Sequence, residues 1–337
     1  MSHLRKALRF AIIGVALAIA PAPVLAQSKQ PSESREAPAA PTEAALAVGA
    51  LQIGSVANLE VAGFDIAVTA GSIVYSYYFT NKSSADLAVT AALSLPELHA
   101  SADRSETWTL ARNDAENFVD LSITAGGGPV ATKAAVRATA LGVDRLAEIQ
   151  TERLPLLPFG AATDKALAAL SPETADRLAA LGIVSPRNPA QPKAPLTGDW
   201  SLEVVQTWRL TLPAGKTTPV VVKFAPIAAH YRLSKGDEDE ISDIKEEVCL
   251  KPQVLNMLQS RLKGNGAWNV IDISLAADAP TRWIDSPAAT ISVQKPKPDA
   301  IVAFCGLDEK TAAKPAVFGT APEDNEGIRI VIFEPAK

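Results

Sequence analysis

Two alternating runs within residues 73–96 constrain the fold more than any other stretch of this chain. The first run has large apolar residues at every second position, Ile73, Tyr75, Tyr77 and Phe79, and the second has Leu87, Val89, Ala91, Leu93 and Leu95. A period of two is typical of strands with one buried face. The polar residues 81–84 between the runs suit a turn. The sequence therefore predicts a β-hairpin with Tyr75, Tyr77 and Phe79 in the core, and with Tyr78 on the opposite face, where it could meet a partner.

The same alternation returns later in the chain. Residues 204–212 form a predicted strand, residues 213–216 a turn and residues 220–224 a return strand. We expect Trp208, within the first of these strands, to be buried, because such an aromatic residue belongs to the core more often than to a ligand platform. Shorter strands are predicted at 51–53, 59–61, 64–68, 108–110, 118–123, 271–275, 290–293, 300–305 and 328–332.

Apolar residues at helical spacing predict short helices near residues 140–182 and 239–263. In the first region, Ser171 suits an N-cap, Pro172 the first turn and Gly182 the helix end. In the second region, Pro252 starts a helix that ends at Gly264. The expected fold class is therefore mainly β with helical insertions (α+β), as one or two antiparallel sandwich-like lobes.

The acidic residues 237–247 allow two interpretations. Asp237, Asp239 and Asp243 carry the oxygen ligands that calcium prefers, but the spacing of a calcium-binding EF-hand loop is absent. Ile241 and Ile244 instead fall on one face of a helix. The sequence therefore favours a helix here, with a calcium-stabilised module as the weaker alternative.

The N-terminus has the features of a secretory signal. Arg5, Lys6 and Arg9 precede an apolar run at residues 10–20, and small residues end at Ala26. The run is too short to span a bilayer, which needs about 20 helical residues, so an uncleaved anchor is disfavoured. We expect residues 1–26 to be removed after Ala26, which gives a periplasmic or secreted protein. Residues 27–45 read as a flexible leader rich in Pro, Ser and Ala, followed by one domain at 46–337 or two lobes at about 46–230 and 231–337.

Charge excludes two classes of partner. Removal of residues 1–26 takes away three positive charges and no acid, so the net charge of −5 becomes −8. Nucleic acid and anionic membrane surfaces reward a basic patch, so neither is expected as a partner. No later segment has 18 uninterrupted apolar residues, so no stable membrane insertion is expected after cleavage.

The two cysteines, Cys249 and Cys305, remain after cleavage. An even pair in an exported protein indicates a disulfide rather than two free thiols. The loop that it closes would span 56 residues and contribute about 4 kcal/mol in the chain-entropy model. A redox or metal pair is the alternative, but the close C-x-x-C spacing of such sites is absent.

No catalytic, cofactor-binding or metal-binding residues emerge from the sequence. His99 and His230 are isolated, and no metal-ligand spacing surrounds them. The serine hydrolase motif G-x-S-x-G is absent. Two carboxylates that are distant in sequence could still meet in space, as glycoside hydrolysis requires.

The chain resembles a bacterial family of exported proteins, the domain-of-unknown-function family 4424. The matching features are Y-x-F-x-N and L-S-L-P within residues 75–96, WRLTLPAG at 208–215, Cys249 after an acidic helix, and Phe-Cys-Gly at 304–306. The resemblance covers residues 46–333. Ser94 departs from it, where an aromatic residue is expected, and so does the long Pro-rich leader. The resemblance implies an exported location and this architecture, and it carries no catalytic residues.

Together these features favour a non-enzymatic binding or interaction module of the cell envelope with an unknown partner or ligand. Such a module should have a groove or apolar patch without clustered titratable groups. The alternative is an envelope hydrolase that acts on glycan or peptide. It should bring Asp, Glu or His side chains, among them His99 or His230, together in a cleft with perturbed pKa values.

Overall fold

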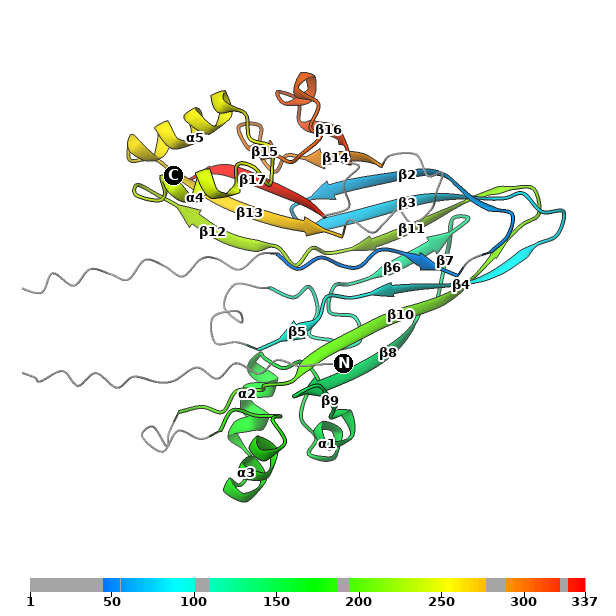
Figure 1. The fold of residues 1–337 in the computed structure, drawn as a ribbon, viewed down its shortest axis with the longest axis vertical. Coiled ribbons are helices and arrows are strands. Elements are labelled where there is room, and N and C mark those ends of the chain that lie inside the picture. The colour runs from blue at the N-terminus through cyan, green and yellow to red at the C-terminus, as the bar shows by residue number, and fades with distance from the viewer. Residues whose placement is uncertain are drawn as a thin grey trace, which may run out of the picture. The chain divides into compact units, whose positions relative to one another are not determined.

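The computed structural model of this protein describes residues 45–54, 56–100, 109–186, 194–276, 289–321 and 327–336. These residues form three β-sheets and five α-helices (Figure 1). The predicted fold class, mainly β with helical insertions, is confirmed. The predicted signal peptide at 1–26 and nearly all of the predicted leader at 27–45 lie outside the described residues.

Two of the sheets supply most of the strands. The six-stranded sheet contains β1 (Gln52–Ile53), β4 (Leu87–Ser94), β5 (Leu98–His99), β8 (Lys133–Ala140), β9 (Val143–Asp144) and β10 (Ser201–Leu212). Its order is β1-β4-β10-β8-β9, and β5 also pairs with β10. The seven-stranded sheet contains β2 (Leu59–Thr69), β3 (Ser72–Asn81), β6 (Ser122–Ala125), β7 (Gly128–Pro129), β11 (Thr217–Phe224), β14 (Thr290–Gln294) and β16 (Ala316–Thr320). Its order is β16-β14-β2-β3-β11-β6-β7, with β14 parallel to β2.

The inner faces of these two sheets share one apolar core. Along β3, β4, β10 and β11 the inward side chains alternate with outward ones, and the buried apolar ones among them belong to the same cluster. Tyr75, Tyr77 and Phe79 are all buried, as the alternation predicts, and so is Trp208. The two sheets therefore pack face to face as a sandwich.

The strands of both predicted hairpins exist, but the predicted pairing is wrong. β3 pairs with β2 and β11, whereas β4 pairs with β1 and β10. In each case the chain crosses from one sheet to the other and forms an arch, and the two arches, β3–β4 and β10–β11, lie side by side. Alternation shows only that each strand buries one face. It cannot distinguish strands that pair edge to edge from strands that face each other across a core.

The side chain of Asn81 joins the corners of the two arches. Asn81 is fully buried, and its Nδ2 donates to the carbonyls of Ala85 (2.8 Å) and Leu212 (2.9 Å). Its Oδ1 accepts from the backbone N–H of Ser83 (2.8 Å). The segment that reads as a hairpin turn is therefore a corner whose buried polar groups are satisfied by one amide.

The first helical region is as predicted, and the strand before it was missed. α1 (Leu146–Thr151), α2 (Ala161–Ala168) and α3 (Pro172–Ala180) bury one face against β8 and Trp200. The Ser171 hydroxyl caps α3 by accepting from the N–H of Thr174 (3.1 Å). β8 is rich in alanine, which has low strand propensity, so its pairing with β10 overrides local preference.

A four-stranded sheet carries the second pair of helices. It has the order β12-β13-β17-β15 and contains β12 (Ala229–Leu233), β13 (Ala267–Leu275), β15 (Ile301–Ala303) and β17 (Ile328–Ala336). One face adds to the sandwich core. The other packs against α4 (Glu238–Ile244) and α5 (Pro252–Lys263), where Trp268 Nε1 donates to the Leu258 carbonyl (3.1 Å). We call α4 and α5 the helical cap.

Residues 45–53, which we call the strap, connect the two sides of the sandwich (Figure 1, blue). The N–H of Leu46 donates to the carbonyl of Ile227, just after β11 (3.1 Å), and that of Gly49 donates to Ser94 at the end of β4 (2.8 Å). The strap then pairs with β4 through β1. Leu51 is buried in the shared core.

Candidate binding site between the sheets

Three polar atoms in the sandwich core have no hydrogen-bond partner among the described residues. They are the hydroxyls of Tyr75 and Tyr77 on β3 and Nε1 of Trp208 on β10. Each of these side chains is at most 3% exposed. Two further atoms of this kind, in Ser72 and Arg145, belong to residues outside the core. Buried polar groups nearly always have partners, and leaving one without costs about 1–3 kcal/mol. We call Tyr75, Tyr77 and Trp208 the interior polar cluster.

The two arches place Tyr77 and Trp208 at the same level of the core. Asn81 and Leu212, which are hydrogen-bonded at the corner, end β3 and β10. Residues 77 and 208 each lie four positions before these ends, and both side chains face inward. Trp208 pairs with Ala91 on β4. The polar atoms thus come from opposing sheets.

Aromatic rings surround the two hydroxyls. Tyr77 stacks on Phe64 with ring centres 4.5 Å apart, and Tyr75 meets Phe224 edge to face at 5.4 Å. The rings of Tyr75 and Tyr77 are 6.3 Å apart. Polar groups within an aromatic wall are typical of sites that bind a largely apolar molecule and orient it by a few hydrogen bonds.

The strap lies beside the interior polar cluster. The backbone of Leu51 is next to the Tyr77 hydroxyl, without the geometry of a hydrogen bond. Ile53 pairs with Ala91, the residue that Trp208 faces from the other side. The strap therefore runs along the edge of β4 and reaches the Tyr77 hydroxyl.

The cluster can bind but cannot transfer protons near neutral pH. Burial raises the pKa of Tyr75, and burial together with the nearby Tyr75 hydroxyl raises the pKa of Tyr77. Both phenols therefore stay neutral and can each donate and accept hydrogen bonds, while the indole N–H of Trp208 can only donate. A general base would need a pKa close to the working pH.

Sequence reasoning placed these residues correctly but missed their chemistry. It explained Tyr75, Tyr77 and Trp208 by packing alone. The available signal was that phenylalanine would fill the positions of both tyrosines without burying a hydroxyl. Tyr78, on the outer face, is 37% exposed and packs over Gly63 of the paired strand. That contact accounts for an aromatic side chain there, and a partner for Tyr78 stays a prediction.

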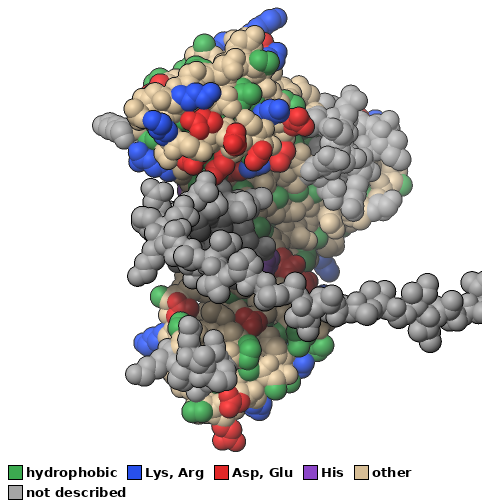
Figure 2. All heavy atoms as spheres, turned by 60° about the vertical axis from the view of Figure 1, so that its left-hand side comes forward, with side chains coloured by type: hydrophobic (Ala, Val, Ile, Leu, Met, Phe, Trp, Pro, Cys, Tyr) green, Lys and Arg blue, Asp and Glu red, His purple; other side chains and the backbone are tan. Residues whose placement is uncertain are grey.

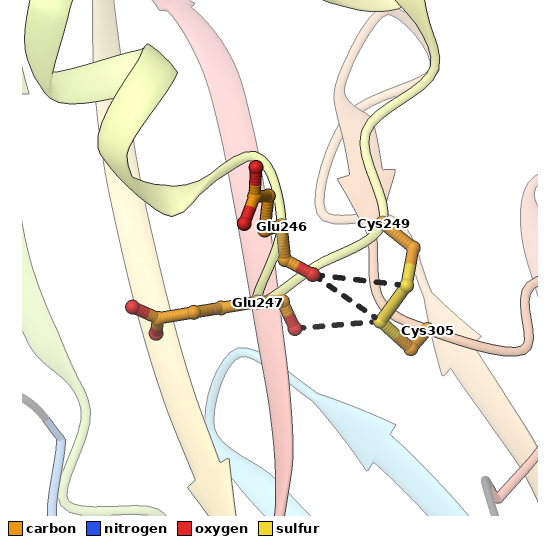
Figure 3. The surroundings of a disulfide bond; sticks show 4 residues. All are labelled: Glu246, Glu247, Cys249 and Cys305. Carbon is orange, nitrogen blue, oxygen red and sulfur yellow. Dashed lines mark hydrogen bonds between the residues drawn. A yellow bond between two sulfur atoms is a disulfide. The ribbon is translucent and has the colours of Figure 1, made fainter.

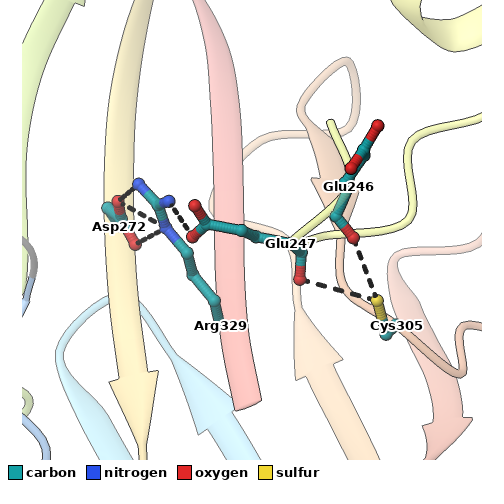
Figure 4. Close-up of polar contacts among 5 residues, drawn as sticks. All are labelled: Glu246, Glu247, Asp272, Cys305 and Arg329. Carbon is teal, nitrogen blue, oxygen red and sulfur yellow. Dashed lines mark hydrogen bonds and ion pairs between the residues drawn. The ribbon is translucent and has the colours of Figure 1, made fainter. Parts of the chain in front are cut away.

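The helical cap is anchored by an ion network that the sequence did not predict (Figure 4). Arg329 on β17 donates from Nε to both carboxylate oxygens of Asp272 on β13 (3.2 and 3.0 Å) and from Nη1 to Glu247. Asp272 is 1% exposed. Burial opposes the charge of Arg329, but its hydrogen bonds and ion pairs with Asp272 and Glu247 prevail and raise its pKa. The buried carboxylate of Asp272 thus has an opposite charge within hydrogen-bond distance, which offsets the cost of burying it.

Cys249 and Cys305 form a disulfide with an S–S distance of 1.99 Å (Figure 3). It joins the segment between α4 and α5 to the segment after β15. The sulfur of Cys305 lies 3.5 Å from the carbonyl oxygen of Glu247. A disulfide sulfur carries no proton, so this is a packing contact. Cys249 is exposed and Cys305 is half-buried.

The other sequence candidates do not converge. His99 lies on β5 opposite Ser201, and His230 lies on β12 opposite Ile271, so the histidines belong to different sheets. The acidic stretch forms α4 as a helix with Ile241 buried, which confirms the helical interpretation. Among the described residues, no group of three or more His, Cys, Asp or Glu could hold a metal ion. Figure 2 shows Asp and Glu side chains (red) gathered on the upper part of the molecular face, with Lys and Arg (blue) beside them.

Comparison with known proteins gives a family and a weak likeness to solved structures. The family described as "Domain of unknown function (DUF4424)" matches residues 39–325. No curated protein matches the chain. One similar solved structure is a "putative nutrient binding protein" from Legionella pneumophila, with 8% identity and a TM-score of 0.39, covering 86% of this chain and 71% of that one. A likeness this weak gives no argument about function. No helix in the described part of the chain is long and apolar enough to cross a membrane.

Proposed function

We propose that this chain, which belongs to the family of unknown function DUF4424, is a non-enzymatic binding module of the cell envelope. The observation that carries the proposal is the interior polar cluster, with three buried polar atoms that lack partners among the described residues. A ligand that hydrogen-bonds to them would remove a cost that the ligand-free fold bears. Binding would therefore be driven by satisfaction of these atoms and by apolar contact.

The proposed location rests on sequence features. Residues 1–26 have the charge and apolar pattern of a signal peptide, with cleavage after Ala26. Disulfides persist in oxidising compartments, and the Cys249–Cys305 bond fits export to the periplasm. The alternative of an envelope hydrolase gains no support from the described residues, because the histidines lie on different sheets and Asp272 is ion-paired.

Native mass spectrometry tests the proposal on protein expressed with its full sequence and recovered from the periplasm. We expect a polypeptide that begins at Gln27 and carries a noncovalent adduct heavier than water, which denaturation removes. A double variant, Tyr75→Phe with Tyr77→Phe, should lose the adduct, while the matched control Tyr78→Phe should keep it. A bare polypeptide in every preparation would contradict binding, and a chain that retains residues 1–26 would contradict export.

A further inference from the structure

The structure also indicates what kind of ligand the site takes and how it enters. We infer that the ligand is an uncharged molecule with an apolar body and an oxygen acceptor (carbonyl, ether or hydroxyl), and that it enters beneath the strap. This inference rests on the proposed function and narrows it to a chemical class and a route.

The hydrogen-bonding capacity of the cluster calls for an acceptor. Trp208 Nε1 is a donor only, so an acceptor oxygen is the group that satisfies it. Tyr75 and Tyr77 each add one proton to donate, and neither finds an acceptor among the described residues. Three donors from two sheets therefore lie in a core that is mostly apolar, where the buried polar side chains of Asn81, Gln206 and Thr218 are the exceptions along these strands.

The surroundings of the cluster exclude a charged ligand. Among the described residues, Asp272 is the one Asp, Glu, Lys or Arg residue that is buried. The buried Asp272 alternates with the core residues Ile271 and Ile273 along β13 and is already paired with Arg329. A charge placed between the sheets would be desolvated without a counter-charge, which is strongly unfavourable.

The strap is attached to the sheets by few backbone hydrogen bonds, although Val48, Ala50 and Leu51 are buried in the core. Its described backbone hydrogen bonds to the sheets are those of Leu46 and Gly49 and the two-residue pairing of β1 with β4. In contrast, β3 pairs with β11 along eight residues, from Thr80 with Thr217 to Ile73 with Phe224. Segments with few backbone hydrogen bonds open at lower free energy than long ladders do. The strap can therefore open while the sandwich stays intact.

Two fluorescent probes of similar size test the ligand class on the mature chain, residues 27–337. Prodan is uncharged and has one ketone oxygen, whereas anilinonaphthalene sulfonate is anionic. We expect prodan to bind with a blue-shifted emission and the sulfonate to bind about tenfold more weakly or worse, because its charge finds no partner. Equal binding of the two probes would overturn the assignment of an uncharged ligand.

Point variants test the acceptor. Tyr77→Phe and Trp208→Phe keep the ring in place and remove one donor, so each should weaken prodan binding by about fivefold. Tyr78→Phe makes the same change on the outer face and should leave binding unchanged. Prodan affinity that is unaltered by Tyr77→Phe and Trp208→Phe would show that the probe binds elsewhere and would overturn the inference.

A reversible disulfide between the strap and β4 tests the entry route of the ligand. A Cβ placed at Gly49 would lie 3.3 Å from the Cβ of Ser94 and 3.0 Å from the Ser94 carbonyl oxygen, so a shift of a few tenths of an ångström would bring the two Cβ atoms to the separation of about 3.8 Å found in disulfides. The variant with Gly49→Cys and Ser94→Cys should therefore tie the strap to β4. We expect the oxidised variant to bind prodan at least about tenfold more slowly than the same variant under mild dithiothreitol. Wild-type protein under both conditions is the control for Cys249–Cys305.

Each negative result identifies which part of the proposal fails. If no probe binds and no adduct copurifies, the proposed function itself fails. If an adduct copurifies but proves to be charged, the ligand class is wrong and the binding function stands. If oxidised and reduced strap variants bind at equal rates, the entry route is wrong. Mass mapping of the disulfide between residues 49 and 94 establishes that it has formed in each preparation.

Discussion

At the scale of single residues, the hydroxyls of the interior polar cluster lower the stability of the ligand-free fold and, on the proposed function, strengthen ligand binding. Tyr75 and Tyr77 bury hydroxyls where phenylalanine would pack as well, so the ligand-free core carries a polar cost. Natural proteins break local rules of this kind mainly where function requires it. On the proposed function, the hydroxyls contribute hydrogen bonds to the bound ligand.

Replacement of Tyr75 by Phe should stabilise the ligand-free protein. The hydroxyl is fully buried and has no partner among the described residues, so its removal should raise the free energy of unfolding by about 1 kcal/mol. Urea denaturation of ligand-stripped protein measures this. Tyr78→Phe is the matched control and should change little. A loss of stability in the Tyr75 variant would mean that its hydroxyl already has a partner in the ligand-free fold.

Arg329 shows the opposite case, because it is the partner that the buried carboxylate of Asp272 needs. Arg329→Met should destabilise the protein by about 3–5 kcal/mol, because Asp272 is left buried and unpaired. Glu247→Gln removes the exposed arm of the same network and should cost less than about 1 kcal/mol. An unpaired buried carboxyl has a raised pKa, so the folded variant binds protons more readily than its unfolded chain. The loss of stability in Arg329→Met should therefore become smaller as pH falls. Equal losses in Arg329→Met and Glu247→Gln would contradict this account.

At the scale of elements, the sequence predicts strands better than it predicts their partners. The alternation in β3, β4, β10 and β11 correctly assigned the buried faces, because burial has a local pattern. Their pairing brings together residues far apart in the sequence, such as Asn81 and Leu212, whose hydrogen bond no local pattern reveals. The sequence did not predict β8, because its alanine residues have low strand propensity and form a strand by pairing with β10.

The same limit applies to the functional site. Each member of the interior polar cluster could be assigned to the core from its own strand. That Tyr77 and Trp208 occupy matching positions on opposing sheets became evident only from the crossing of the two arches. The network of Glu247, Asp272 and Arg329 likewise joins residues from three separate elements, and nothing in the spacing of these residues predicts it.

The disulfide fastens the helical cap to the end of β15. Replacing Cys249 and Cys305 together by Ser should lower the free energy of unfolding by about 4 kcal/mol, because the 56-residue loop regains chain entropy when unfolded. Urea denaturation without reductant measures the loss, and wild-type protein in reductant should show the same one. Prodan binding should persist, because the disulfide contributes no residue to the interior polar cluster. A loss below about 1 kcal/mol would show that the bond does not constrain the unfolded chain.

At the scale of the whole molecule, the sandwich and the helical cap differ in whether their buried polar groups have partners. The cap is held by paired charges, a disulfide and its own apolar cluster, all of which satisfy the groups they bury. The sandwich instead retains three buried polar atoms without partners among the described residues, beneath a strap with few attachments. Paired charges and the disulfide thus lie in the cap, and the unpartnered polar atoms of the interior polar cluster lie in the sandwich core.

The central claim is that a ligand satisfies the interior polar cluster. A high-resolution crystal structure of protein purified from its native envelope tests this most directly. We predict continuous electron density larger than water between the sheets, with an oxygen atom within hydrogen-bond distance of Trp208 Nε1 and of at least one hydroxyl of Tyr75 or Tyr77. Isolated water molecules at these atoms, or direct hydrogen bonds from them to other side chains, would contradict it.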